Sequence, residues 1–138
     1  MKKILFLCLA CLFAVAISTS QAAFEERTES FYSNMTDEGV AFYKKLKSCT
    51  PAKYKESKES VYGKTKTGQC HYSFKEYYKG DLVDYDCFMP MSVAIGYATT
   101  ALDVYEYTKD PSALAYQRLV QNNEIRKVMR DYCKMRIK

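Results

Sequence analysis

The sequence predicts an α+β domain, in which an N-terminal helix, a small antiparallel β-meander and two or three C-terminal helices pack together, reinforced by disulfides. Two segments, 69–78 and 84–89, alternate polar with apolar residues on either side of a short turn, which is typical of a β-hairpin. Apolar residues recur at helical spacing both before and after this hairpin. The even number of cysteines in the main part of the chain indicates disulfides.

Residues 1–22 have the layout of a cleaved signal peptide. The basic Lys2-Lys3 precedes an unbroken apolar run from Ile4 to Ile17, and small or polar residues lead to Ala22-Ala23, after either of which cleavage would fall. The apolar run is shorter than the roughly 20 residues that a membrane-spanning helix needs. We therefore expect a single domain at 23–138, periplasmic or secreted, with no transmembrane segment in the mature chain. The basic start is typical of bacteria.

The mature domain begins with a polar stretch, 23–35, that is either a loose lead-in or a short helix. Thr36 and the two acidic residues after it are typical of a helix start, and Pro51 ends the pattern, so we expect a helix over 37–48. The polar segment 54–62 is compatible with a strand, and a glycine-flanked turn follows it.

The next two strands surround the turn Lys79-Gly80-Asp81. In 69–78, Cys70 shares one face with two aromatic residues, and in 84–89, Cys87 shares one face with a tyrosine and a methionine. Both cysteines would therefore point toward the core.

Pro90 opens the following helix, whose apolar stripe ends before Asp110-Pro111. The segment 111–136 predicts a last helical stretch. A break is expected at 121–124, because the apolar residues on its two sides do not fall on one helical face.

The mature chain keeps four cysteines, Cys49, Cys70, Cys87 and Cys133, for which three pairings are open. We favour bridges from the strand residues Cys70 and Cys87 to helix cysteines across the core, over a Cys70–Cys87 bridge. No cysteine pair has the spacing of a zinc site and the chain has one histidine, so neither a metal nor a cofactor is expected.

Three short motifs carry a resemblance. They are Leu46-Lys47-Ser48-Cys49-Thr50-Pro51, Gly68-Gln69-Cys70-His71-Tyr72 and Asp86-Cys87-Phe88. The pattern Cys-x-Pro, Gly-x-Cys-x-Tyr and a second Cys strand resembles small exported bacterial proteins of unknown function. The resemblance covers 37–89, about half of the mature chain, and implies a fold but no activity.

His71 is the candidate for acid–base chemistry, because it is the only histidine. Alternation places it on the face opposite Cys70, beside Ser73 and Lys75, which favours a surface histidine over a catalytic one. Asp84 or Asp86 would be its acidic partner. The acidic cluster of Glu76, Asp81, Asp84 and Asp86 is expected to form a solvated turn and strand face.

Tyrosine is the composition's main excess, with 13 residues and no tryptophan. A tyrosine provides contact area with a polar tip, which suits a binding surface as well as the edge of a core. Tyr77 and Tyr78 are adjacent on a strand, so at least one should be exposed. With His71 they are the candidate binding residues; no catalytic residue is assigned.

The C-terminal segment is basic. Its cations are Arg126, Lys127, Arg130, Lys134, Arg136 and Lys138. A solvated helix face is the expected interpretation, with weak contact to an anionic surface as the alternative. Loss of the signal peptide lowers the net charge from +5 to +3, which gives no reason to expect a nucleic-acid partner.

These observations favour a non-enzymatic, exported binding protein that contacts an envelope protein or glycan through a tyrosine-rich face. The first alternative is a small hydrolase that uses His71 with Asp84 or Asp86. The second is a structural component of the envelope. No P-loop, Gly-x-Ser-x-Gly or dinucleotide-binding motif occurs.

Overall fold

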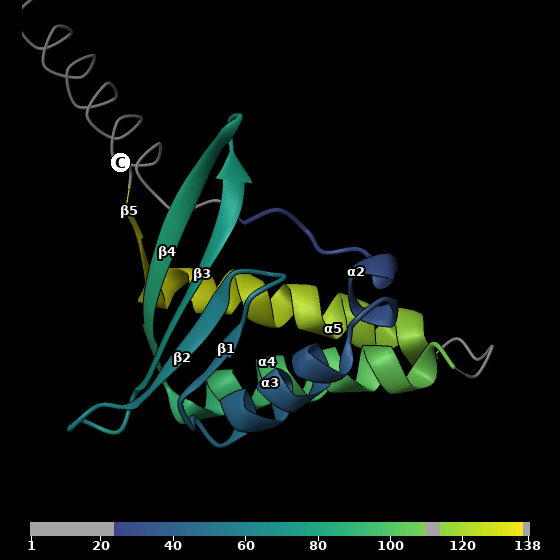
Figure 1. Cartoon of the computed structure of the whole chain (residues 1–138), viewed down its shortest axis with the longest axis horizontal. Helices are drawn as coiled ribbons and strands as arrows, with labels where there is room; N and C mark the ends of the chain where they lie inside the picture. Colours follow the sequence, from purple (N-terminus) through teal and green to yellow (C-terminus); the bar gives the residue numbers. More distant parts are fainter. Residues whose placement is uncertain (1–23, 110–113, 137–138) are drawn as a thin grey trace, which may run out of the picture.

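The computed structural model describes residues 24–109 and 114–136 and confirms the α+β class. A five-stranded antiparallel sheet has the strand order β1-β2-β3-β4-β5, and the helices lie together on one side of it (Figure 1). The strands are β1 (Ala52–Tyr54), β2 (Glu59–Lys64), β3 (Cys70–Tyr78), β4 (Asp81–Met89) and β5 (Cys133–Arg136). The helices are α2 (Glu29–Ser33), α3 (Asp37–Lys47), α4 (Met91–Tyr107), α5 (Leu114–Met129) and the 3-10 turn η1 (Arg130–Tyr132). The expected signal peptide lies outside the described residues.

The predicted N-terminal helix is confirmed in part. Its main body is α3, and the Thr36 hydroxyl accepts a hydrogen bond from the Gly39 N–H at 3.4 Å at its start. A short helix, α2, precedes it after an extended segment. Gly39 allows α3 to approach β1, because a Cβ there would lie 2.4 Å from Met35 Cγ and 2.7 Å from the Tyr54 ring.

The hairpin of β3 and β4 is longer than the sequence predicts. The two strands pair over their whole length, from Cys70 opposite Met89 to Tyr78 opposite Asp81. They are joined by Lys79-Gly80, whose positive φ values of 50° and 85° fit the tight turn of a twisted hairpin. The predicted strand 54–62 is instead two strands, β1 and β2, separated by a turn.

The prediction of a helix as far as residue 136 is wrong, because α5 ends at Met129. The predicted break at 121–124 is also wrong, because α5 is continuous through these residues. Helix α5 continues to Met129, and β5 then pairs with β4 (Figure 1). The apolar stripe is interrupted because Asn122 is a buried polar residue of α5: its amide donates to the Tyr97 carbonyl at 3.1 Å and to the Thr100 hydroxyl at 2.9 Å. After α5, the residues of β5 alternate between half-buried and exposed, as in a strand.

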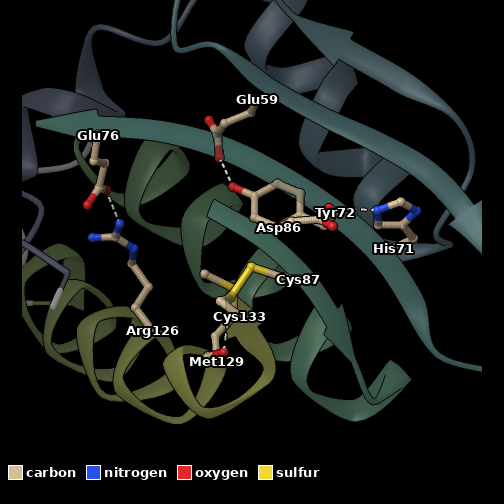
Figure 2. Close-up of a disulfide and its surroundings, with 9 residues drawn as sticks. All are labelled: Glu59, His71, Tyr72, Glu76, Asp86, Cys87, Arg126, Met129 and Cys133. Atoms are coloured by element: carbon tan, nitrogen blue, oxygen red, sulfur yellow. Dashed lines mark hydrogen bonds and ion pairs between the residues drawn. A yellow bond between two sulfur atoms is a disulfide. The ribbon is translucent and has the colours of Figure 1, made fainter. Parts of the chain in front are cut away.

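Two disulfides, Cys49–Cys70 and Cys87–Cys133, join the cysteines, so Cys70 and Cys87 are not bridged to each other. The first links the end of α3 to β3, as favoured. The second differs from the expectation, because Cys133 is the first residue of β5 and lies directly opposite Cys87 in the sheet. It therefore joins neighbouring strands and fixes the C-terminal segment to the sheet edge (Figure 2).

Tyrosine fills the core between the sheet and the helices. Six tyrosines are buried: Tyr32, Tyr43, Tyr54, Tyr72, Tyr85 and Tyr97. Their rings meet edge to face or stacked, as between Tyr43 and Tyr97 with centroids 5.8 Å apart. Much of the tyrosine excess therefore serves packing, and a binding role concerns the exposed remainder.

Candidate functional site

The helices of the described residues lie on one side of the sheet (Figure 1), and we call the other side the outer sheet face. Side chains alternate along each strand, so the residues between the buried ones point away from the helices. The described members used below are Lys53, Ser60, Tyr62, His71, Ser73, Lys75, Tyr77, Asp84, Asp86, Phe88, Lys134 and Arg136.

An aromatic row crosses one end of this face. The register between β2 and β3 shifts between Val61 and Gly63, so Tyr62 is the extra residue of a β-bulge, and Gly63 takes a φ of 115°. The bulge brings the Tyr62 ring to 4.4 Å from the His71 ring, which stacks on the Phe88 ring at 4.3 Å. The imidazole is therefore held between two aromatic rings.

His71 also has the acidic partner that the sequence proposed. Its Nε2 lies 2.7 Å from Asp86 Oδ1 (Figure 2), and the other carboxylate oxygen of Asp86 accepts a hydrogen bond from Arg136 at 2.6 Å. Asp84 is instead 3.8 Å from the ammonium group of Lys75. Of the two acids considered, only Asp86 contacts the imidazole.

Two depressions adjoin on this face. The His71 pocket, of about 270 Å³, is lined by Tyr62, His71, Ser73, Asp84, Asp86 and Arg136, with Tyr85. The second, of about 510 Å³, shares Tyr62, Ser73 and Asp84 with the first and is lined by four lysines, Lys53, Lys55, Lys58 and Lys75. We call it the lysine groove.

The candidate binding residues are separated. Tyr77 is on the outer sheet face and 61% exposed, whereas Tyr78 is half-buried against the core, so the two point to opposite sides as expected. Tyr77 lies six positions after His71 on β3, a span of about 20 Å at about 3.3 Å per residue. The partners of His71 are Tyr62 and Phe88 instead.

The acidic cluster does not form one solvated face. Asp84 and Asp86 lie on the outer sheet face, but Glu76 points to the helix side, where the Arg126 guanidinium donates to its carboxylate (Figure 2). The expectation of a solvated basic helix face is wrong for Arg126, whose side chain is 2% exposed. Lys134 and Arg136 belong to β5, and Lys138 lies outside the described residues.

A second charge pair lies deeper in the core. The side chain of Glu59 is fully buried and accepts hydrogen bonds from the hydroxyls of Tyr43, at 2.8 Å, and of Tyr72 and Ser57. Arg27 lies 3.5 Å from the same carboxylate and donates to the Tyr43 hydroxyl at 2.9 Å. Figure 2 shows the Tyr72–Glu59 bond.

This network was missed from the sequence, although strand alternation contained part of it. Glu59 shares a face with Val61, and Glu76 shares one with Phe74, and both neighbours are buried. The alternation therefore placed both glutamates inward, and only their residue type argued against it. No comparable signal identifies Arg27, which lies in an extended segment before α2.

The buried tyrosines should be visible in an alkaline titration. Burial raises the pKa of Tyr32, Tyr43, Tyr72 and Tyr97 above the usual 10.0. The folded state thus holds these protons more tightly than the unfolded chain, so the free energy of unfolding should fall as the pH rises above 10. We expect these four tyrosines to ionise only as the protein unfolds, as measured by phenolate absorbance. Ionisation of all 13 in one reversible step would contradict this, and protein unfolded in guanidinium is the control.

Glu59 should account for much of the decrease in the free energy of unfolding at acid pH. Burial alone would raise its pKa, but Arg27 and the hydrogen bonds from Ser57, Tyr72 and Tyr43 outweigh burial and hold the pKa below 4.5. Its stabilising contribution is therefore complete above pH 4.5 and lost as the pH falls through the lower pKa of the folded state. We expect urea unfolding at stepped pH to show a shallower acid decline in Glu59→Gln than in the wild type. Parallel declines would rule this out.

The described residues contain no group of three or more His, Cys, Asp or Glu side chains that could hold a metal ion. Within the same residues, no helix is both long and apolar enough to cross a membrane. No family model, no curated protein and no solved structure matches the chain. The resemblance to small exported proteins therefore stays a prediction.

Proposed function

We propose that the protein is an exported, non-enzymatic binding protein of the bacterial envelope, and that its outer sheet face contacts an envelope protein or glycan. The observation that carries this proposal is the aromatic row beside two adjoining polar depressions. Tyr62 is 54% exposed and Phe88 37% exposed, although the core has taken up most of the other aromatic side chains. Aromatic residues left partly in water beside hydrogen-bonding groups are typical of binding surfaces.

The geometry of the row supports a preformed surface. The imidazole of His71 is fixed between two rings and by Asp86, and the Tyr62 hydroxyl lies 2.9 Å from the Ser73 hydroxyl. Because these side chains already hold one another, a ligand would need to order few of them on binding. A strand-based site of this kind is also more rigid than one on loops.

Two disulfides support export. Both bridges close within the described residues, and disulfides persist mainly in oxidising compartments. If mature protein isolated from such a compartment were alkylated at all four cysteines without reductant, the export proposal would lose this support.

Affinity capture from an envelope extract tests the binding function. The mature protein is immobilised, and captured protein and glycan are both identified by mass spectrometry. We expect a specific component to be retained by the wild type and lost with Tyr62→Ser combined with Phe88→Ser. Tyr116→Ser is the matched control, because Tyr116 is 66% exposed on α5, on the helix side.

The control distinguishes specific binding at the outer sheet face from non-specific binding through any exposed aromatic residue. Equal loss with Tyr116→Ser, or recovery of nothing specific from either pool, would count against the proposal. If nothing specific is captured, and cells without the protein have an envelope defect that no surface substitution reproduces, the structural-component alternative would be favoured.

The 2.7 Å contact between His71 and Asp86 supports a second candidate, a small hydrolase in which Asp86 orients the imidazole as a general base. His71→Phe distinguishes the two, because a phenyl ring keeps the stack between Tyr62 and Phe88 but removes the base. A binding protein should keep its captured partner in this variant. A hydrolase should lose all turnover of a captured glycan or peptide.

A further inference from the structure

We infer that the lysine groove binds an anionic polysaccharide, one that carries carboxylate or phosphate groups along its chain. This inference deepens the proposed function and rests on it, since the groove is part of the outer sheet face.

The groove has an excess of positive charge. Four lysines line it, and all four are exposed. The one acid that lines the groove from the outer sheet face is Asp84, 3.8 Å from Lys75. Glu59 also contributes to the lining, but its carboxylate is turned into the core and used there. Among the described residues, no acid forms an ion pair with the other three lysines.

The lysines are spread along the groove. Lys53 lies on β1, Lys55 and Lys58 lie in the turn between β1 and β2, and Lys75 lies on β3. With strands about 4.8 Å apart, the distance from β1 to Asp84 on β4 is about 15 Å. A small anion would contact few of these charges at once, whereas a chain with repeated charges can contact all of them. The volume of about 510 Å³ accommodates several sugar units.

The floor of the groove fits sugar. Tyr62 stands between the groove and the His71 pocket, and an aromatic ring packs against the apolar face of a sugar while its hydroxyl bonds to the polar edge. Ser60 and Ser73 lie opposite each other on β2 and β3 and place further hydroxyls along the floor. The floor suits an acidic peptide less well, because β2 and β3 are each paired on both sides and a peptide could add a strand only at the outer edge of β1, beyond the floor.

The test uses fluorescently labelled polygalacturonate and dextran phosphate, with neutral dextran and polyglutamate as comparison polymers. Fluorescence anisotropy is measured on the mature protein at low salt. We expect the two anionic polysaccharides to bind, dextran to bind at least about tenfold more weakly, and binding to weaken as NaCl rises from about 50 mM to about 500 mM. The relative affinity of the first two polymers shows whether carboxylate or phosphate is preferred.

Paired variants locate the site. Lys53→Gln combined with Lys58→Gln should weaken polygalacturonate binding by about fivefold or more, since two cations that form no ion pair with a described acid are lost. The matched control is Lys44→Gln with Lys45→Gln, which removes the same charge from exposed positions on α3. Tyr62→Ser should weaken polysaccharide binding without altering polyglutamate binding.

Three results would overturn the inference: equal weakening by the α3 control, equal affinity for dextran, or equal affinity for polyglutamate. The proposed function has a separate outcome. If polygalacturonate and dextran phosphate fail to bind, but Tyr62→Ser with Phe88→Ser still abolishes capture from the envelope extract, the outer sheet face remains the binding surface and only the ligand class is wrong.

Discussion

Replacing Arg27 by methionine is expected to lower the free energy of unfolding by about 3–5 kcal/mol, the usual cost of leaving a buried charge without its partner. The guanidinium lies 3.5 Å from Glu59 and 3.7 Å from Glu76, and it donates to the hydroxyls of Tyr43 and Tyr97. Methionine fills similar volume but supplies neither charge nor donor, so the Glu59 carboxylate would be left in the core with hydroxyls alone. Urea unfolding followed by circular dichroism measures the change.

Two further variants make this prediction specific to burial. Arg118→Met removes an exposed guanidinium, 3.7 Å from Asp103, and should change stability by less than about 0.5 kcal/mol. Adding Glu59→Gln to Arg27→Met should recover at least about 1 kcal/mol, because the unpaired charge disappears. A loss below about 1 kcal/mol for Arg27→Met alone would show that the network is not a major source of stability.

Removing the Cys87–Cys133 bridge, as Cys87→Ala with Cys133→Ala, should cost about 4 kcal/mol in the chain-entropy description. The bridge spans 46 residues, against 21 for Cys49–Cys70, and the shorter loop predicts about 3 kcal/mol. The longer bridge also holds β5, a short edge strand. We therefore expect its loss to abolish hydrogen-exchange protection in β5 while β3 stays protected.

The control is the variant without the other bridge, Cys49→Ala with Cys70→Ala. Each of the two variants removes two buried or half-buried cysteines, so the difference between them isolates loop length and the attachment of β5. If loss of Cys49–Cys70 costs more than loss of Cys87–Cys133, loop entropy does not set the order. If β5 stays protected without its bridge, backbone pairing with β4 is sufficient to hold it.

Short sequence signals, such as capping residues and prolines, correctly predicted the elements that they begin or end. Helix α3 begins after Thr36 and ends before Pro51, as a capping hydroxyl and a proline require. Strand β5 was not predictable in this way, because its charged residues suit a helix equally well. It becomes a strand because β4 provides an unpaired edge and Cys87 provides a disulfide partner. Both are tertiary interactions, and they override local propensity.

The candidate site was predictable only in part, for a similar reason. The alternation of residues along the strand was sufficient to predict that His71 points outward, and Asp86 was one of the two candidate partners predicted for it from the sequence. The rest of the site depends on register: Phe88 lies opposite His71 in the hairpin, and a bulge moves Tyr62 beside it. Arg136 reaches Asp86 from a strand that the sequence did not predict.

The N-terminal segment that carries the buried Arg27 also affects the order of folding. The backbone N–H of Arg27 donates to Asn123, and Arg126 donates to the Glu25 carbonyl, so contacts 96 and 101 residues apart join the start of the described chain to α5. For a chain delivered amino end first, whether from a ribosome or through an export channel, the first segment can meet Tyr43 and Glu59 early, but it cannot complete its docking until α5 emerges. Such long-range contacts slow folding. The topology itself therefore places the last contacts of this segment at the end of delivery, when synthesis or passage is nearly complete.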